Sequence, residues 1–162
     1  MNGLAETAEA FVEVAHRIVW ATVATVDRRN RPRTRILHPY WEWDGERLVG
    51  WCGTFPTPLK RAHLRHSPYT SLTYWTPDHD TATADCETEL VFEDDVRERV
   101  WNRFKELEPP LGYDPAEMPP WKDGPTGQGF AVLRFEPWRL KVLLPGPPMG
   151  SRPEPVQLVW SR

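Results

Sequence analysis

Basic side chains in two short stretches are the residues of this sequence best suited to chemistry. Arg33 and Arg35 lie two positions apart in an extended run, so their side chains share one face of a strand. Lys60 and Arg61 follow Thr57-Pro58, a helix N-cap residue and a proline at the first helical position. The N–H groups and dipole of a helix N-terminus attract anions, and Arg and Lys add charge-assisted hydrogen bonds. Together, the two stretches predict a phosphate-binding site.

A simpler interpretation of the same residues is also open. Arg33 and Arg35 could belong to a solvated edge strand, since residues 28–31 contain three more arginines. Thr57 could be an ordinary helix cap, because Ser and Thr are common at that position. Only the combination of the strand with the helix makes the phosphate site specific.

Two histidines are candidates for proton transfer, because the unperturbed pKa of histidine is near neutrality. His38 lies in an extended run just before Pro39, where it is either a structural residue or a proton donor to a substrate. His79 lies between Asp78 and Asp80, and a tight turn built on the Asp side chains explains it more simply than chemistry does.

Short β-prone runs and few helical patterns predict a mainly β, α+β fold, an antiparallel barrel of six or seven strands with peripheral helices. Extended runs are found at 21–26, 33–41, 47–52, 69–75, 81–92, 130–135, 139–144 and 156–160, with Pro137 as a break. Helical patterns cover 4–17, 57–66 and 93–108. A loop rich in Pro and Gly follows over 109–129, and a loop of this length is usually functional or part of an interface.

Length and composition describe one domain over residues 1–162. A net charge of −3 gives no sign of a nucleic-acid or anionic-membrane partner. We expect no membrane-spanning segment and no export signal. Cys52 and Cys86 are far apart, which favours a reduced, cytoplasmic protein over a disulfide. They share no ligand spacing with His38 or His79, so no metal site is expected.

The order of motifs in residues 15–76 is distinctive. A strand ends in Arg-x-hydrophobic, a Thr follows the third strand, a Lys opens a helix, and an aromatic strand follows a proline. In this order the chain resembles the pyridoxamine 5′-phosphate oxidase-like, FMN-binding superfamily of split β-barrels, and in particular its actinobacterial branch. The resemblance implies a homodimer that holds FMN, or the deazaflavin F420, at the subunit interface.

The resemblance also implies roles for five residues. Arg35 and Lys60 match residues that contact the flavin phosphate. Thr54 matches a threonine near the isoalloxazine ring and the ribityl chain. Ile36 and Leu37 match the strand backbone that runs beside the ring.

Further cofactor contacts are expected around this motif. Arg61 takes the place of an arginine that the family carries before the helix lysine. Tyr74 and Trp75 end the strand after the helix and are candidates to stack on the flavin. His38 or Arg33 is expected to stabilise the reduced ring near its pyrimidine end.

The predicted function is therefore an FMN-dependent oxidoreductase with an unidentified small-molecule substrate, and His38 is the candidate catalytic residue. Two alternatives are an F420-dependent reductase, whose longer acidic tail would need Arg31, Arg61 and Arg65, and a non-catalytic flavin-binding module. The C-terminal Arg-x-His motif of true pyridoxamine phosphate oxidases is absent, since the chain ends Leu-Val-Trp-Ser-Arg. Oxidation of vitamin B6 phosphates is therefore not predicted.

Overall fold

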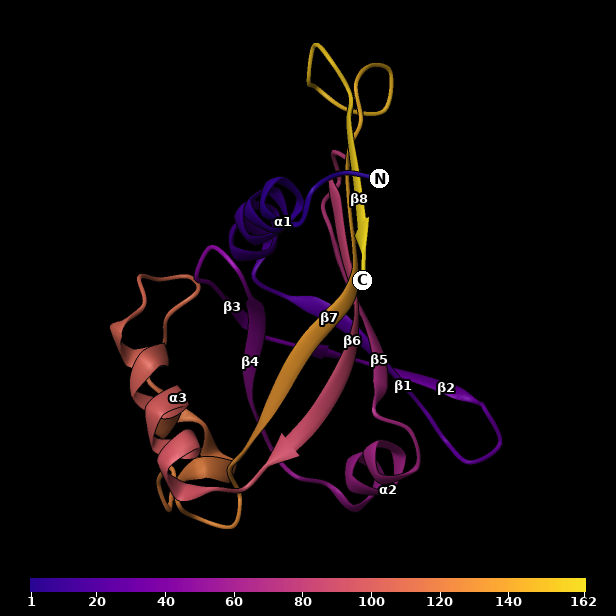
Figure 1. Cartoon of the computed structure of the whole chain (residues 1–162). Coiled ribbons are helices and arrows are strands. Elements are labelled where there is room, and N and C mark those ends of the chain that lie inside the picture. Colours follow the sequence, from indigo (N-terminus) through magenta and orange to yellow (C-terminus); the bar gives the residue numbers. More distant parts are fainter.

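The computed structural model describes all 162 residues as one antiparallel sheet with three helices around it (Figure 1). The helices are α1 (Leu4–Ile18), α2 (Pro58–His66) and α3 (Asp94–Glu106), with short 3-10 turns η1 (Pro115–Glu117) and η2 (Pro119–Trp121). The strands are β1 (Ala21–Val26), β2 (Pro32–Leu37), β3 (Tyr40–Trp43), β4 (Leu48–Thr54), β5 (Tyr69–Trp75), β6 (Thr81–Val91), β7 (Ala131–Leu144) and β8 (Val156–Ser161). This confirms the expected α+β class, with eight strands where six or seven were predicted.

The run predicted as one strand over 33–41 is two strands. β2 ends at Leu37 and β3 begins at Tyr40, since Pro39 has no N–H to donate to a ladder. The strand order is β2-β1-β5-β6-β7-β4-β3, so β2 and β3 are its two ends. His38 and Pro39 therefore cross from one edge of the sheet to the other, and the barrel stays open between these edges.

The break predicted at Pro137 is wrong, because β7 is continuous from Ala131 to Leu144. The first part of β7 pairs with β4 and the last part pairs with β8, so the strand changes partner around Pro137. A register shift in β6 at Asp85/Cys86 lies opposite this point. The missing N–H of proline is tolerated where one ladder has ended and the next has not begun.

Two apolar cores lie on the sheet. The larger core places Phe11 and Val14 of α1 against Trp41 and the inner side chains of the strands. The smaller core joins Val100 and Phe104 of α3 to β3, β4 and the segment before β7. The amphipathic patterns predicted for both helices are thereby confirmed.

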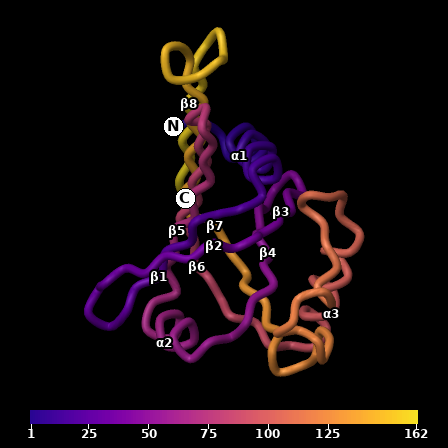
Figure 2. Tube along the Cα trace, turned by 180° about the vertical axis from the view of Figure 1, so that it is seen from behind, coloured from indigo at the N-terminus to yellow at the C-terminus, as the bar shows by residue number.

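Two hairpins project from this body. Figure 2 shows the β1–β2 hairpin extending to one side and the β7–β8 hairpin extending away from the barrel with its long connection at the tip. α2 lies near the base of the β1–β2 hairpin in both views. This arrangement brings the start of α2 close to the arginine-bearing strand β2.

Candidate functional site

A cleft of about 700 Å³ opens between β2, the end of β4, the start of α2 and the segment 110–121. This volume is within the usual range of small-molecule sites. The structure brings seven of the ten predicted site residues to its walls: Arg33, Arg35, Ile36, Leu37, His38, Thr54 and Lys60. The open edge of the barrel thus coincides with the region that the sequence motifs indicated.

Lys60 is the most buried cation of the cleft, with 8% of its surface exposed. Its position is set by the first turn of α2, where the Thr57 hydroxyl accepts a hydrogen bond from the Lys60 backbone N–H at 3.2 Å. The Lys60 ammonium donates to the Thr54 hydroxyl and, at 2.9 Å, to the carbonyl oxygen of Phe55. An ammonium has three N–H groups, so one of them is left for a ligand.

Arg35 and Arg33 extend the positive charge along β2. The Nη1 of Arg35 donates a hydrogen bond of 3.5 Å to the carbonyl oxygen of Val23, and the side chain forms no other hydrogen bond. Arg35 and Lys60 line a second, smaller cavity together, so the two cations converge from different elements. Neither Arg33, Arg35 nor Lys60 forms an ion pair with a carboxylate.

Burial, with a neighbouring arginine in each case, lowers the pKa values of Lys60 and Arg35. Burial lowers the pKa of the Lys60 ammonium, and Arg35 lowers it further. Burial also lowers the pKa of Arg35, with a contribution from Arg33. Burial raises the pKa of the Cys52 thiol to about 12, so the thiol stays neutral and supplies no counter-charge. Since buried charges are stabilised by an opposite charge, this end of the cleft is suited to an anion.

His38 lines the cleft where the chain crosses between the edges of the sheet. Its Nε2 lies 2.7 Å from the carbonyl oxygen of Leu111, which can only accept, so Nε2 carries the proton. Burial lowers the pKa of His38, and the ring is neutral at pH 7 with Nδ1 as an acceptor. The rings of Trp20 and Tyr113 each lie 4.9 Å from the imidazole, which gives this part of the cleft an aromatic character.

Arg61 does not line the cleft, contrary to the prediction. Its guanidinium stacks over the Phe92 ring at 4.6 Å, and its Nε donates to the carbonyl oxygen of Pro56 at 3.2 Å. The reason is helix geometry, because adjacent residues of a helix point about 100° apart and Lys60 already faces the cleft.

Tyr74 and Trp75 also lie away from the cleft. Tyr74 is fully buried in the larger core, where its hydroxyl accepts a hydrogen bond from Trp41 Nε1 at 2.8 Å. Trp75 points to the opposite face of β5, as strand alternation requires, and is 54% exposed. It lies beside His79, which occupies a turn at a φ of 62°. Neither aromatic residue therefore lines the cleft of its own chain.

The wall that sequence reasoning missed consists of Trp20 and the segment after α3. This segment contributes six lining residues: Pro110, Tyr113, Asp114, Glu117, Met118 and Trp121. The length and proline content of the 109–129 loop indicated a functional segment, but no local pattern shows that it packs opposite β2. Two acidic side chains are thus present on the wall, and Asp114 is engaged with Lys105 at 3.8 Å.

Three further features of the chain bear on function. No helix is both long and apolar enough to cross a bilayer. No group of three or more His, Cys, Asp or Glu side chains is placed to hold a metal ion. Cys52 and Cys86 are both buried free thiols.

No protein-family model matches the chain, and no curated protein matches it by sequence. Solved structures do match. The pyridoxamine 5′-phosphate oxidase-related, FMN-binding protein of Nostoc punctiforme aligns with a TM-score of 0.64 at 15% identity, over 99% of this chain and 100% of that chain. A protein of Clostridium acetobutylicum, related to general stress protein 26 and assigned to the pyridoxinephosphate oxidase family, aligns with a TM-score of 0.69 at 12% identity, over 96% and 94%.

An F420 reductase aligns with a TM-score of 0.56 at 16% identity, over 79% of this chain and 93% of that chain. A heme-binding protein of Mycobacterium smegmatis aligns with a TM-score of 0.62 at 14% identity, over 98% of this chain and 59% of that chain. At these identities the likeness establishes the fold alone. The chain therefore has the split β-barrel fold of the pyridoxamine 5′-phosphate oxidase-like superfamily, as its sequence motifs implied.

Proposed function

We propose that this protein is a flavoprotein that holds FMN in the cleft at a homodimer interface and acts as an oxidoreductase on a small molecule. One observation carries the proposal. Lys60 and Arg35 are cations without carboxylate partners at one end of a cleft that also presents apolar and aromatic side chains. A flat ring with a phosphorylated tail has the complementary distribution of charge.

The residues present fit FMN in type and order. Lys60, Arg35 and Arg33 would hold the phosphate, and the backbone of β2 at Ile36 and Leu37 would lie beside the ring. FMN, when bound, supplies the hydride or electron transfer. The chain's own part is to bind and orient the cofactor, to exclude water, and to offer the neutral Nδ1 of His38 as a proton acceptor.

The same geometry favours FMN over F420. A longer acidic tail would need the arginines that the sequence analysis assigned to it, but Arg31 is paired with Asp27 at 2.6 Å. Arg61 and Arg65 line a separate groove together with Phe92. The cations that do line the cleft are enough for one phosphate group, which supports the shorter cofactor.

A second copy of the chain is part of the proposal. Large apolar side chains stand exposed along the cleft, with Ile36 at 60%, Trp20 at 58% and Phe55 at 48% of their surface. Exposed apolar side chains gathered at one site are typical of an interface. Covering them with a partner would also close the cleft over a bound ring. We place the dimer in the cytoplasm, which suits two free thiols.

The test is a binding comparison on the purified protein. FMN should copurify with the protein, or its addition should raise the melting temperature of the protein. F420 and haem should raise the melting temperature less or not at all. The double variant Arg35→Ala/Lys60→Ala should weaken FMN binding by at least about 100-fold, because each charge-assisted contact contributes about 1.5–3 kcal/mol.

The matched control is Arg29→Ala/Lys122→Ala, which removes the same two charges from exposed positions outside the cleft. It should bind FMN as the wild type does. If the Arg35→Ala/Lys60→Ala variant bound FMN as tightly as the wild type, these two residues would not be part of the FMN site. If haem or F420 raised the melting temperature more than FMN does, that molecule would be the cofactor in place of FMN.

A further inference from the structure

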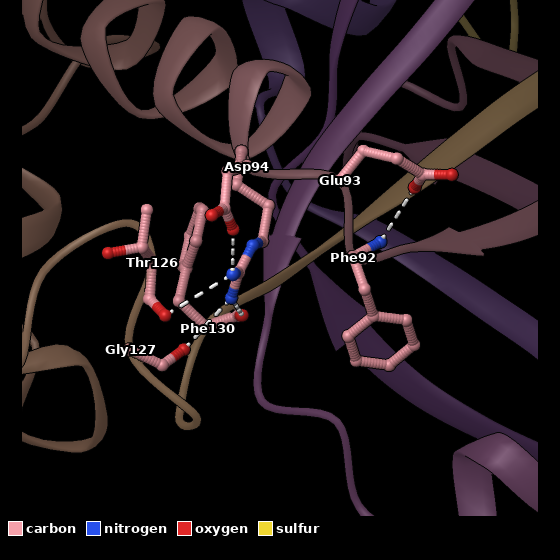
Figure 3. Close-up of polar contacts among 7 residues, drawn as sticks. Phe92, Glu93, Asp94, Thr126, Gly127 and Phe130 are labelled. Atoms are coloured by element: carbon pink, nitrogen blue, oxygen red, sulfur yellow. Dashed lines mark hydrogen bonds and ion pairs between the residues drawn. The ribbon is translucent and has the colours of Figure 1, made fainter.

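Arg97 of α3 is a buried guanidinium that lies outside the cleft but holds the segment behind its wall. It is 8% exposed. Its two terminal nitrogens donate to the backbone carbonyls of Thr126, Gly127 and Phe130 at 3.2, 3.0 and 3.1 Å, and to the carboxylate of Asp94 (Figure 3). Figure 3 shows these acceptors converging from both sides, one from the start of α3 and three from the segment before β7.

The clamped segment connects the cleft wall to the barrel. Trp121 lines the cleft and packs on Phe130 with ring centroids 5.1 Å apart. Phe130 also lies directly under Gly53, another lining residue, where a Cβ would meet the Phe130 ring at 2.7 Å. A shift of the Phe130 backbone would therefore move the wall and the end of β4 together.

Only an arginine satisfies this set of acceptors. The planar guanidinium offers several N–H groups in a fixed fork, so it can reach three carbonyls and a carboxylate at once. A lysine at the same position carries the charge but presents it from a single nitrogen, which cannot span acceptors contributed by two elements. The residue type thus matches a clamp between α3 and the segment 126–130.

We propose that Arg97 is the positioning residue for the cleft, and that ligand affinity depends on this clamp although Arg97 touches no ligand. The part of the inference that concerns ligand affinity rests on the proposed function. The part that concerns the clamp does not, because the position of the segment can be measured in the free protein. The two parts are therefore tested by separate measurements.

The clamp is tested by limited trypsin digestion of the free protein. Lys122 is exposed and lies between the wall and the clamped carbonyls, so cleavage after it reports on opening of the segment. Arg97→Met should speed this cleavage about tenfold, while cleavage after Arg29 in the exposed β1–β2 turn stays constant. The control Arg103→Met makes the same substitution on the solvent side of α3 and should leave the rate at Lys122 unchanged.

The coupling is tested by FMN titration of the same proteins. Arg97→Met should weaken FMN binding about tenfold and Arg103→Met should not. Arg97→Lys, which keeps the charge and serves if Arg97→Met does not fold, should give intermediate values in both measurements. Unchanged cleavage at Lys122 in both Arg97 variants would overturn the clamp, and faster cleavage with unchanged FMN affinity would overturn the coupling. If wild-type protein takes up no FMN, the proposed function fails, and the digestion alone decides the role of Arg97.

Discussion

A single buried lysine determines much of the character of this cleft. The ammonium of Lys60 has only neutral oxygens as partners, from Thr54 and Phe55, and burial lowers its pKa. A charge in this setting is unfavourable in the free protein and becomes favourable when an anion arrives. Functional sites commonly contain groups of this kind, which lower the stability of the free protein and strengthen ligand binding.

His38 gives the residue-scale prediction. The Leu111 carbonyl requires the proton on Nε2, and burial lowers the pKa of the ring below its usual 6.5. Because the folded pKa is lowered, the neutral ring favours the folded state above pH 6.5, and this contribution is lost as the pH falls below that value. Nitrogen NMR of labelled protein should show the Nε2–H tautomer at pH 7, with a midpoint below 6.5.

The variant His38→Gln assigns the resonance by removing it. A ring protonated on Nδ1 at pH 7, or one that titrates above 6.5, would show that the Leu111 contact does not set the tautomer. The proposed role of Nδ1 as a proton acceptor would then fail with it.

At the scale of elements, α2 is the helix that positions the cationic end of the cleft. Its first turn is defined by the Thr57 cap and Pro58, and its later part is held to β1 by a buried hydrogen bond of 2.8 Å between Thr25 and His63. Lys60 lies between these two attachments. The second attachment is to β1, the strand that pairs with β2, so β1 supports both α2 and the strand that carries Arg35.

Loss of the helix cap should therefore affect both stability and binding. Thr57→Ala removes the acceptor of the Lys60 N–H and should lower the free energy of unfolding by about 1 kcal/mol, measured by chemical denaturation. FMN affinity should fall as well, because the first turn of α2 frays. Thr57→Ser keeps the hydroxyl and should behave as the wild type in both assays. If Thr57→Ser lost as much stability as Thr57→Ala, the loss would come from the missing methyl group of Thr57 and not from the missing cap hydrogen bond.

At the scale of the whole molecule, the barrel is open where function is proposed. β2 and β3 are the two ends of the strand order, each paired on one side only, and the cleft residues Ile36 and Trp20 are 60% and 58% exposed. A monomer with this surface would present both free edges and apolar side chains to water. The proposed homodimer would cover both features.

Replacement of Ile36 tests the dimer. The mass measured by light scattering should be twice 18.8 kDa for the wild type and should fall to the monomer value in Ile36→Glu, because a buried carboxylate opposes association. FMN should be lost with the dimer. Met149→Glu changes a side chain of equal exposure, 60%, on the distant β7–β8 connection and should remain dimeric. A monomeric wild type at micromolar concentration would contradict the interface.

Local pattern in the sequence determined the parts of this protein that depend on neighbours in the chain. The spacing of two between Arg33 and Arg35 placed both on one face of a strand, and the Thr57-Pro58 pair marked the start of α2 correctly. The motif order of residues 15–76 indicated the fold. These features follow from backbone periodicity and capping, which act over a few residues.

Tertiary structure alone decided which side chains share the cleft. Tyr74 and Trp75 lie near the motif in sequence, yet strand alternation and core packing take both away from the cleft. Trp121 is more than 60 residues from Lys60, yet it lines the same cleft and packs on Phe130, whose carbonyl oxygen accepts a hydrogen bond from Arg97. Contacts of this kind depend on how elements pack at long range, and no local spacing of residues encodes them.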